Sequence, residues 1–404
     1  MSIRIVVAAV AAAAVSSSIV LAQAQPDQAL VTRARAIHDR TITMDTHVDI
    51  STARFTPACN YTMRLTTQVN FPKMREGGLN APWLIVYTGQ GALTPEGFGG
   101  AYQQAIEKFD AIHRLTKEIA PNQMELALTP SDVVRIRKAG KFAAMIGIEN
   151  GYPVGTDISR VKEFFDRGGR YMSLAHNGNS QLADSNSTEA ANGGIHGGLS
   201  ELGKQVIAEM NKWGMMVDVS HPSKQANMQT IALSQAPVIA SHSSARALAN
   251  HTRNMDDELL LALKKNGGVM QTVAFATYVK VDEHGPARQA AVQALGQEFG
   301  LAAGGGRGGG GARGGGRGAA ATGQPVCPVE TDAPAGTAPT AAGRGGANQA
   351  ALEALPDDRR AEYTRRLTEI NTKYPAMERA TVADFVDHID YAVKLIGIDH
   401  VGIS

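Results

Sequence analysis

Histidine and carboxylate side chains stand at the ends of several short apolar stretches of this chain. The first stretch is TITMDTHVD, residues 41–49, where a run typical of a buried strand finishes with His47 and Asp49. Four more such groups close later apolar runs: Glu149, His176, His221 and His242. Imidazole nitrogens and carboxylate oxygens are ligands that suit borderline divalent cations such as Zn²⁺. The pattern indicates a metal centre, provided that the fold brings the stretches together.

The apolar stretches alternate with amphipathic ones. Each is short, carries few charges and is bounded by Gly, Pro, Asn or Lys, which is typical of strands buried on both faces. The predicted strands are residues 41–47, 79–87, 143–149, 171–176, 215–221, 237–243, 269–275 and 400–404. The helical patterns between them are residues 101–120, 131–140, 158–169, 199–214, 255–268 and 381–397, and several begin at Ser, Thr or Asp and end at Gly.

Strands that alternate with helices place the chain in the α/β class and predict a parallel (β/α)₈ barrel of the TIM type. The alternative is an open, doubly wound sheet. That fold would favour a Gly-rich phosphate loop after the first strand, and the sequence has none there. In a parallel barrel the carboxyl ends of all strands open on one face, so the polar strand ends would converge there.

Five of the converging groups suit two metal ions better than one. A single catalytic zinc ion that keeps an open position takes fewer ligands. Glu149 is the natural bridge, because it stands alone between two flanking pairs, His47 with Asp49 and His221 with His242. Two ions held a few ångströms apart can polarise a carbonyl group and hold a hydroxide between them.

Each of these residues also has an ordinary explanation. A single histidine at a strand end is more often a hydrogen-bonded structural residue than a ligand, so the interpretation depends on five groups falling together at four strand ends. Asp45 and Asp218 lie inside predicted strands and are expected to orient neighbouring histidines through hydrogen bonds. The remaining histidines considered are expected to be ordinary: His113, His196, His251, His284, His388 and His400.

The N-terminus has the layout of a secretory signal peptide. Arg4 precedes an apolar run, and Ala22-Gln23-Ala24 forms a small-x-small cleavage site, so residues 1–24 are predicted to be removed and residues 25–404 to form the exported protein, periplasmic or secreted. A transmembrane anchor is the alternative, but three serines interrupt the apolar run. Lys and Arg total 39 against 38 for Asp and Glu, which gives no electrostatic reason to expect a nucleic acid partner.

Residues 303–347 break the alternation between the seventh and eighth strands. They are dominated by Gly, Ala, Arg and Pro, so this Gly/Ala/Arg-rich insertion is expected to be disordered. Nucleic acid binding through its arginines is disfavoured, because the segment has no aromatic residues. The only two cysteines are Cys59 and Cys327, the second inside this segment; a disulfide between them stays open, and a zinc–thiolate site needs more cysteines.

The motifs that contain the candidate ligands resemble those of the membrane dipeptidase family (renal dipeptidase-like, peptidase family M19). Members of this family are binuclear zinc peptidases built on a (β/α)₈ barrel related to the amidohydrolases. The resemblance runs from about residue 41 to the last residue, apart from the insertion. The matching stretches are DTHVD, IGIENG, YMSLAHNGNS, GLSELGKQVIAEMNKWGMMVDVSH, PVIASHSSARAL, HTRNMDDELLLALKKNGGVMQ and TVADFVDHIDYAVKLIGIDHVGIS.

The resemblance implies that His47 and Asp49 bind one Zn²⁺ ion, that His221 and His242 bind the other, and that Glu149 bridges them. It also implies that His176 contacts the region of the scissile carbonyl. Arg253, in the HTRN motif, is expected to bind the carboxylate of a dipeptide, a role suited to a permanently charged bidentate donor. The alternative for Arg253 is a salt bridge with an aspartate at the start of the following helix.

In the family, the eighth strand runs into an Asp-Phe-Asp-Gly type motif whose first Asp assists proton transfer. This chain stops at Ser404, so we expect a barrel truncated at its eighth strand, without a certain catalytic acid or base. The expected function is that of an exported binuclear zinc dipeptidase that uses a metal-bridging hydroxide. Alternatives are an amidohydrolase-type enzyme acting on N-acyl amino acids or lactones, and a non-catalytic binding protein. A homodimer is compatible with the sequence, which does not predict the dipeptide preference.

Overall fold

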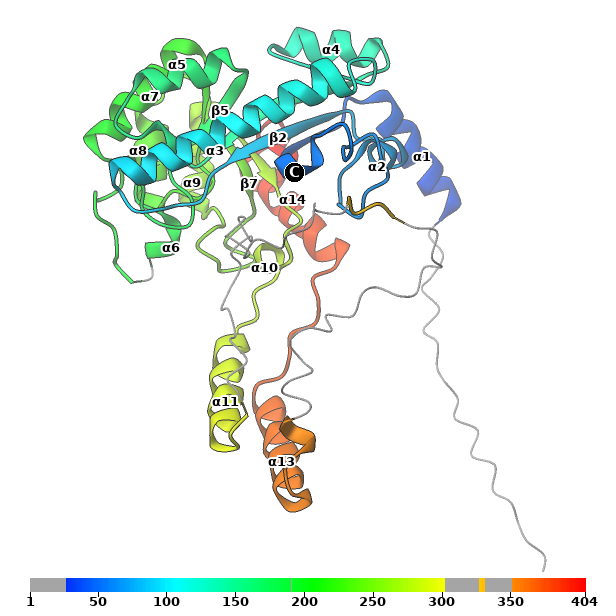
Figure 1. Ribbon diagram of the computed structural model, residues 1–404, viewed down its shortest axis with the longest axis vertical. Helices are drawn as coiled ribbons and strands as arrows, with labels where there is room; N and C mark the ends of the chain where they lie inside the picture. The colour runs from blue at the N-terminus through cyan, green and yellow to red at the C-terminus, as the bar shows by residue number, and fades with distance from the viewer. Residues whose placement is uncertain (1–26, 190, 302–326, 331–350) are drawn as a thin grey trace, which may run out of the picture. The chain divides into compact units, whose positions relative to one another are not determined.

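The computed structural model describes residues 27–189, 191–301, 327–330 and 351–404 (Figure 1). The chain divides into two compact units between Thr41 and Ile42. In the first unit, helix α1 (Gln28–Arg40) begins at Asp27, whose side chain accepts a hydrogen bond from the backbone N–H of Ala29. The signal peptide predicted for residues 1–24 lies outside the described residues.

The second unit is built on a ring of eight parallel strands. Their order in the sheet is β1-β2-β4-β5-β6-β7-β8-β9, and each adjacent pair is parallel. The strands are β1 Met44–Asp49, β2 Ala81–Tyr87, β4 Phe142–Glu149, β5 Gly169–Ser173, β6 Met216–Asp218, β7 Ile239–Ser243, β8 Val269–Thr272 and β9 Val401–Ile403. The ring is nearly closed, since Ser404 after β9 lies 3.5 Å from the Asp45 carboxylate of β1. The predicted (β/α)₈ barrel is confirmed.

Two details of the sheet differ from the prediction. A short strand, β3 (Met124–Leu126), pairs with β4 outside the ring and was not predicted. The strands predicted at 171–176, 215–221 and 269–275 are shorter, because β5 ends at Ser173, β6 at Asp218 and β8 at Thr272. The residues that follow these three strands leave the regular ladder at the carboxyl face of the barrel.

Helices connect the strands and cover the barrel. In the second unit they are α2 Phe71–Gly77, α3 Pro95–Arg114, α4 Pro130–Lys138, α5 Ser159–Asp166, α6 Asn186–Glu189, α7 Glu201–Trp213, α8 Lys224–Leu233, α9 Asp257–Asn266, α10 Ala276–Val279, α11 Gly285–Glu298, α13 Asp357–Lys373 and α14 Val382–Ile396, with short turns η1 Thr52–Arg54, η2 Leu115–Ile119, η3 Tyr152–Val154 and η4 Ile398–His400. Capping follows the sequence pattern. Ser200 caps the N-terminus of α7, because its side chain accepts a hydrogen bond from Gly203 N–H, and Gly214, with φ 81°, caps the C-terminus.

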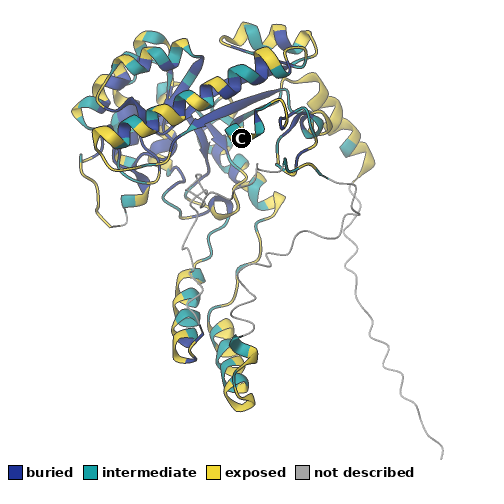
Figure 2. Ribbon diagram, in the orientation of Figure 1, coloured by how far each residue is buried: buried dark blue, intermediate teal, exposed yellow. Residues whose placement is uncertain are grey.

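The strand bodies form the core of the barrel. All eight residues of β4 are buried, and β2 is dark blue in Figure 2, whereas the outward faces of α3 and α4 carry yellow, exposed residues. Gly147 makes room for Tyr171 inside the barrel, because a Cβ atom on Gly147 would lie 2.1 Å from the Tyr171 ring. Burial on both faces explains why β2 and β4 read as continuous apolar runs. Among the described helices, none has the length and apolar character needed to cross a bilayer.

The connection between β8 and β9 holds α10, α11, the insertion, α13 and α14. The described part of the insertion, residues 327–330, does not fit the expectation of disorder, because Cys327 forms a disulfide with Cys59 and Val329 pairs with Leu65 in an antiparallel bridge. The remainder of residues 303–347 lies outside the described residues. Helices α11 and α13 pack together through an apolar cluster that includes Phe299 and Tyr363.

Candidate metal centre

The candidate ligands lie at the carboxyl end of the barrel, as predicted. Glu149 is the last residue of β4, His47 and Asp49 belong to β1, and His242 belongs to β7. His176 and His221 lie in the loops that follow β5 and β6, beyond the strand ends where they were expected. The barrel therefore brings together residues that are far apart in the sequence: Thr46 of β1 donates a hydrogen bond to the carbonyl of Ser241 in β7, 195 positions away.

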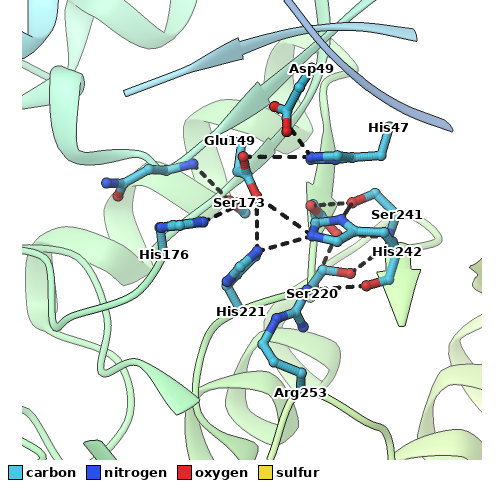
Figure 3. Close-up of polar contacts among 12 residues, drawn as sticks. His47, Asp49, Glu149, Ser173, His176, Ser220, His221, Ser241, His242 and Arg253 are labelled. Carbon is cyan, nitrogen blue, oxygen red and sulfur yellow. Dashed lines mark hydrogen bonds and ion pairs between the residues drawn. The ribbon is translucent and has the colours of Figure 1, made fainter. Parts of the chain in front are cut away.

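Glu149 stands among four imidazole rings (Figure 3). Its Oε2 atom is 3.5 Å from Nε2 of His47. Its Oε1 atom is 2.8 Å from Nε2 of His221, 3.4 Å from that of His176 and 3.5 Å from that of His242. Two groups of three residues have ligand atoms close enough for one cation each: His47, Glu149 and His242, and Glu149, His176 and His221. Glu149 is common to both groups, the position expected of a bridging ligand.

Two residues lie differently from what their predicted roles suggest: Asp49, predicted as a metal ligand, and His176, predicted as a substrate contact. The Asp49 carboxylate is 3.9 Å from His47 Nε2, and 59% of its side chain is exposed. His176, expected to contact substrate, is buried and as close to Glu149 as His242 is. By distance, His176 therefore lies among the candidate ligands, whereas Asp49 stands at their exposed edge.

Two residues of the site, one ligand and one neighbour of a ligand, adopt the left-handed backbone conformation, which non-glycine residues rarely occupy. His221 has φ 85° and Asn150, next to Glu149, has φ 78°. The His221 carbonyl accepts a hydrogen bond from Asn186 N–H at 2.9 Å, and Asn150 N–H donates to Ser173 Oγ at 2.9 Å. Such conformations persist where the surrounding structure holds them and are concentrated at functional sites.

A buried hydrogen-bond chain orients His242. The Asp218 carboxylate of β6 accepts from Ser220 N–H at 3.0 Å, from Ser241 N–H at 2.9 Å and from the Ser241 hydroxyl at 2.7 Å. Ser241 Oγ lies 2.8 Å from His242 Nδ1. Because the single hydroxyl proton points to Asp218, Nδ1–H of His242 donates to Ser241, and the lone pair of Nε2 faces Glu149. Asp218 thus has the orienting role expected of it.

Asp45 has a related but weaker role at β1. Its Oδ1 atom accepts a hydrogen bond from the backbone N–H of His47 at 2.9 Å, so it fixes the main chain and does not contact the imidazole. The Nδ1 atoms of His47 and His221 are buried without a hydrogen-bond partner among the described residues. The sequence interpretation missed Ser241 altogether; its signal is a hydroxyl residue directly before the histidine in PVIASHS.

The charges of the site are strongly coupled. Burial raises the pKa of Glu149, but the positive charges of His47 and His176 and hydrogen bonds from His176 and His221 outweigh burial and hold that pKa well below its usual value. Burial lowers the pKa of His47, but the Glu149 carboxylate outweighs burial and raises it to about 9. In the metal-free site the protonated His47 is therefore paired with the Glu149 carboxylate.

The pKa values of His221 and His242 are shifted in the opposite direction. Burial, together with the positive charge of Arg253, holds the pKa values of His221 and His242 well below normal. Their Nε2 atoms are 2.9 Å apart, so these neutral imidazoles direct nitrogen atoms at the same small space beside Glu149. Neutral imidazoles and an ionised carboxylate are the forms that bind a divalent cation. The donor set fits a borderline cation such as Zn²⁺.

The site opens into a cavity of about 790 Å³. Glu149 and four histidines form its floor. Two segments contribute walls: residues 50–69 after β1, and residues 273–278, which follow β8 and enter α10. The wall after β1 includes Ile50, Arg54, Tyr61, Thr66, Thr67, Gln68 and Val69. The floor is polar, and the walls mix apolar and polar side chains.

Arg253 lies beside the floor but lines a separate cavity of about 10 Å³. Its Nη2 atom donates to the His242 carbonyl at 3.1 Å, and its buried Nε atom has no hydrogen-bond partner among the described residues. The alternative salt bridge at the start of α9 is not formed, because Asp256 pairs with Lys224 at 2.6 Å and Asp257 accepts a hydrogen bond from Tyr391.

Most of the other histidines are structural, as expected. The rings of His113, His196, His388 and His400 each lie within 2.9 Å of a backbone carbonyl oxygen. His251 Nδ1 accepts the N–H of Arg253 at 3.0 Å and so fixes the backbone that presents this arginine.

Comparison with known proteins places the chain in a family. The profile of the family described as membrane dipeptidase (peptidase family M19) matches residues 31–404. The chain is 34% identical over 221 residues to Dipeptidase aclJ of Aspergillus oryzae, covering 54% of this chain and 51% of that protein. It is 35% identical over 221 residues to Dipeptidase tcpJ of Claviceps purpurea, covering 54% of this chain and 50% of that protein. The matched region thus spans about half the length of these curated relatives.

The fold also agrees with a solved structure. The crystal structure of the probable dipeptidase PvdM from Pseudomonas aeruginosa has a TM-score of 0.67 and 27% sequence identity, covering 93% of this chain and 86% of that one. The profile match covers nearly the whole described chain, and the resemblance inferred from the sequence motifs is confirmed. The chain belongs to the membrane dipeptidase family, peptidase family M19.

Proposed function

We propose that the protein is an exported, zinc-dependent dipeptidase whose two metal ions share Glu149. The observation that carries this proposal is the position of the Glu149 carboxylate within 3.5 Å of four imidazole Nε2 atoms at the floor of a large cavity. Family membership and the dipeptidase names of the relatives support the reaction class. Export rests on the predicted signal peptide of residues 1–24.

The residues that would hold the ions are the predicted set, His47, Asp49, Glu149, His221 and His242. Two divalent cations supply Lewis-acid polarisation of a peptide carbonyl and a water of lowered pKa. Asp49 reaches this set from the exposed edge, where its carboxylate has room to move toward His47. The Asp218–Ser241 chain keeps Nε2 of His242 unprotonated and aimed at Glu149.

Two further residues would act on the substrate. His176 lies at the floor, and its Nε2 atom is 3.4 Å from Glu149, so it can donate a hydrogen bond to a carbonyl oxygen placed over the floor. Arg253 holds a buried guanidinium with an uncommitted Nε beside His242, which suits it to bind the free carboxylate of a dipeptide.

The test begins with metal content. The purified chain, stripped with a chelator and reloaded with Zn²⁺, is expected to bind close to two ions per chain by elemental analysis and to hydrolyse L,L- or L,D-dipeptides. A panel that includes N-acyl amino acids and lactones distinguishes the dipeptidase from the amidohydrolase-type alternative. Metal binding without hydrolysis of any member of the panel would favour a non-catalytic binding protein and defeat the proposal.

A further inference from the structure

Residues 327–330 are bound to a wall of the cavity at several points, and we call them the clamp segment. Cys327 forms the disulfide with Cys59, across a sequence separation of 268 residues. Pro328 accepts a hydrogen bond from Thr66 N–H at 2.7 Å, and Glu330 N–H donates to the Arg64 carbonyl at 2.8 Å. The clamp segment therefore pairs with residues 64–66 through one isolated antiparallel bridge, Val329 with Leu65.

The charge of Glu330 strengthens this attachment. Its carboxylate is 2.9 Å from Arg64 Nε and 2.5 Å from Lys73 Nζ. Lys73 Nζ also donates to the carbonyls of Leu65 at 3.0 Å and Thr67 at 2.8 Å. Each ion pair is partly exposed and worth little alone. Together they join the clamp segment to the same main-chain atoms that lead into the cavity wall.

The wall that receives the clamp segment has little regular structure of its own. Between β1 and α2, residues 50–70 contain one helical turn, η1, and otherwise run as loops. They are anchored by buried side chains, including Phe55, Leu65 and Tyr61. Thr66, which donates to Pro328, is itself a wall residue, and the next three residues continue the wall. A wall built from loop backbone keeps its shape through such outside contacts.

We propose that the clamp segment positions this wall for substrate binding, so that affinity for substrate depends on the Cys59–Cys327 disulfide and on Glu330. The inference rests on the proposed function for its kinetic consequence, but the positioning itself does not. None of the three residues lines the cavity floor or belongs to the candidate ligands. They act through the wall and are positioning residues, and the metal centre is unaffected by their loss.

The disulfide makes this positioning sensitive to reductants. A dithiol such as dithiothreitol supplies two electrons and two protons, the S–S bond breaks, Cys59 and Cys327 become thiols, and the dithiol closes to its own disulfide. The clamp segment then keeps only its hydrogen bonds and ion pairs. Reduction is therefore expected to have the same direction of effect as removal of the cysteines.

The first experiment does not need activity. Hydrogen exchange followed by mass spectrometry compares the wild-type chain with the double variant C59S/C327S. Peptides that cover residues 60–69 are expected to exchange faster in the variant, while peptides from β4 and β7 are unchanged. Equal exchange at residues 60–69 would overturn the inference, and this readout stands even when no substrate is hydrolysed.

The second experiment separates substrate binding from chemistry. For C59S/C327S, KM for a hydrolysed dipeptide is expected to rise roughly tenfold, the scale of one or two lost hydrogen bonds, with kcat and zinc content nearly unchanged. Glu330→Gln is expected to shift KM in the same direction by less. Its matched control is Glu362→Gln, since Glu362 also forms an exposed ion pair, with Arg365 at 2.7 Å in α13.

Dithiothreitol is expected to raise KM of the wild-type chain and to leave C59S/C327S unchanged. The double variant has no other cysteine and therefore reports any direct effect of the dithiol on zinc. A fall in kcat together with zinc loss in C59S/C327S, or an unchanged KM, would contradict the positioning role. Failure of the proposed function would instead leave faster exchange at residues 60–69 with no hydrolysis in either protein.

Discussion

The two ends of the candidate metal centre are built differently. At β7, His242 is held on both sides: Nδ1 contacts Ser241, which donates to Asp218, and the backbone N–H donates to Ser220 Oγ at 3.1 Å. At β1, the His47 imidazole has a buried Nδ1 without a hydrogen-bond partner in the described chain, and the neighbouring Asp49 side chain is 59% exposed. One end is fixed by a buried network, whereas the other lacks such a network and lies beside an exposed carboxylate.

The two ends can therefore contribute differently to the metal centre: one to tight binding of the cation, the other to adjustment when a cation or a substrate arrives. A histidine whose tautomer and ring orientation are fixed binds a cation with little rearrangement. A histidine paired only with the shared carboxylate, beside an exposed aspartate, can adjust when a cation or a substrate arrives. We infer that the β7 end provides most of the affinity for metal and that the β1 end provides the adaptable part. Changes at the two ends should therefore have unequal effects.

The largest effect is expected for Glu149→Gln, because Glu149 is common to both ends. If the loss of this buried charge costs the metal-bound state about 3–5 kcal/mol, as the loss of one partner of a buried charge pair does, affinity for metal falls roughly 10²- to 10⁴-fold. Competition with a chromophoric chelator measures this affinity. The matched control is Glu201→Gln, whose carboxylate is 84% exposed and pairs only with Lys204 on the same helix. Unchanged zinc affinity in Glu149→Gln would mean that the carboxylate is not a ligand.

A smaller effect is expected for Ser241→Ala, which breaks the network at the β7 end alone. Loss of such a supporting partner typically lowers metal affinity about 10- to 100-fold. The change leaves the His242 side chain in place but removes the acceptor that fixes its tautomer. Ser244→Ala is the control, because Ser244 is buried and its hydroxyl donates only to the Val273 carbonyl, at 3.2 Å.

The outcome of this second measurement decides the comparison between the two ends. If Ser241→Ala and Ser244→Ala lower zinc affinity equally, the network is merely part of the core and the proposed contrast fails. If only Ser241→Ala lowers it, while thermal unfolding of the metal-free proteins stays similar, the hydrogen-bond chain acts on the metal site itself.

The sequence predicts the parts of the molecule that local pattern determines. The apolar run that ends at Glu149 was predicted as a strand buried on both faces, and all residues of β4 are buried. Helix α7 has the C-terminal cap, Gly214, that its sequence indicates. The convergence of the ligands then follows from the topology of a parallel barrel. The sequence does not predict the end of β6, since the left-handed backbone of His221 in the loop that follows is held by a hydrogen bond with Asn186 and not by local residue types.

Other features depend on contacts that are distant in the sequence. The clamp segment lies in a stretch whose composition favours disorder, yet a disulfide to a residue 268 positions away and two hydrogen bonds hold it. Strand β3 has only three residues and therefore no readable alternation. Which imidazoles approach one another depends on side-chain orientations above the barrel. For that reason the sequence predicts the ligand set but not that His176 lies as close to Glu149 as His242 does.

The last prediction concerns protons at the β1 end. Because the Glu149 carboxylate outweighs burial and raises the pKa of His47 to about 9, the metal-free protein carries this imidazole protonated at pH 7. A metal ion binds only the neutral form, so zinc uptake at pH 7 is expected to release about one proton from His47. Calorimetric titration with zinc in two buffers of different ionisation enthalpy measures that number.

The pH dependence has a definite sign. Since the folded-state pKa of His47 is raised from 6.5 to about 9, its pairing with Glu149 stabilises the metal-free protein fully below pH 6.5, and this contribution is lost as the pH rises through about 9. Affinity for zinc moves the opposite way and should increase about tenfold per pH unit in that window, as one proton is displaced per ion. His47→Gln removes the titrating group, and its zinc affinity should lose this slope. A wild-type affinity that is flat between pH 6.5 and 8.5 would show that His47 is already neutral, and the β1 end would then resemble the β7 end.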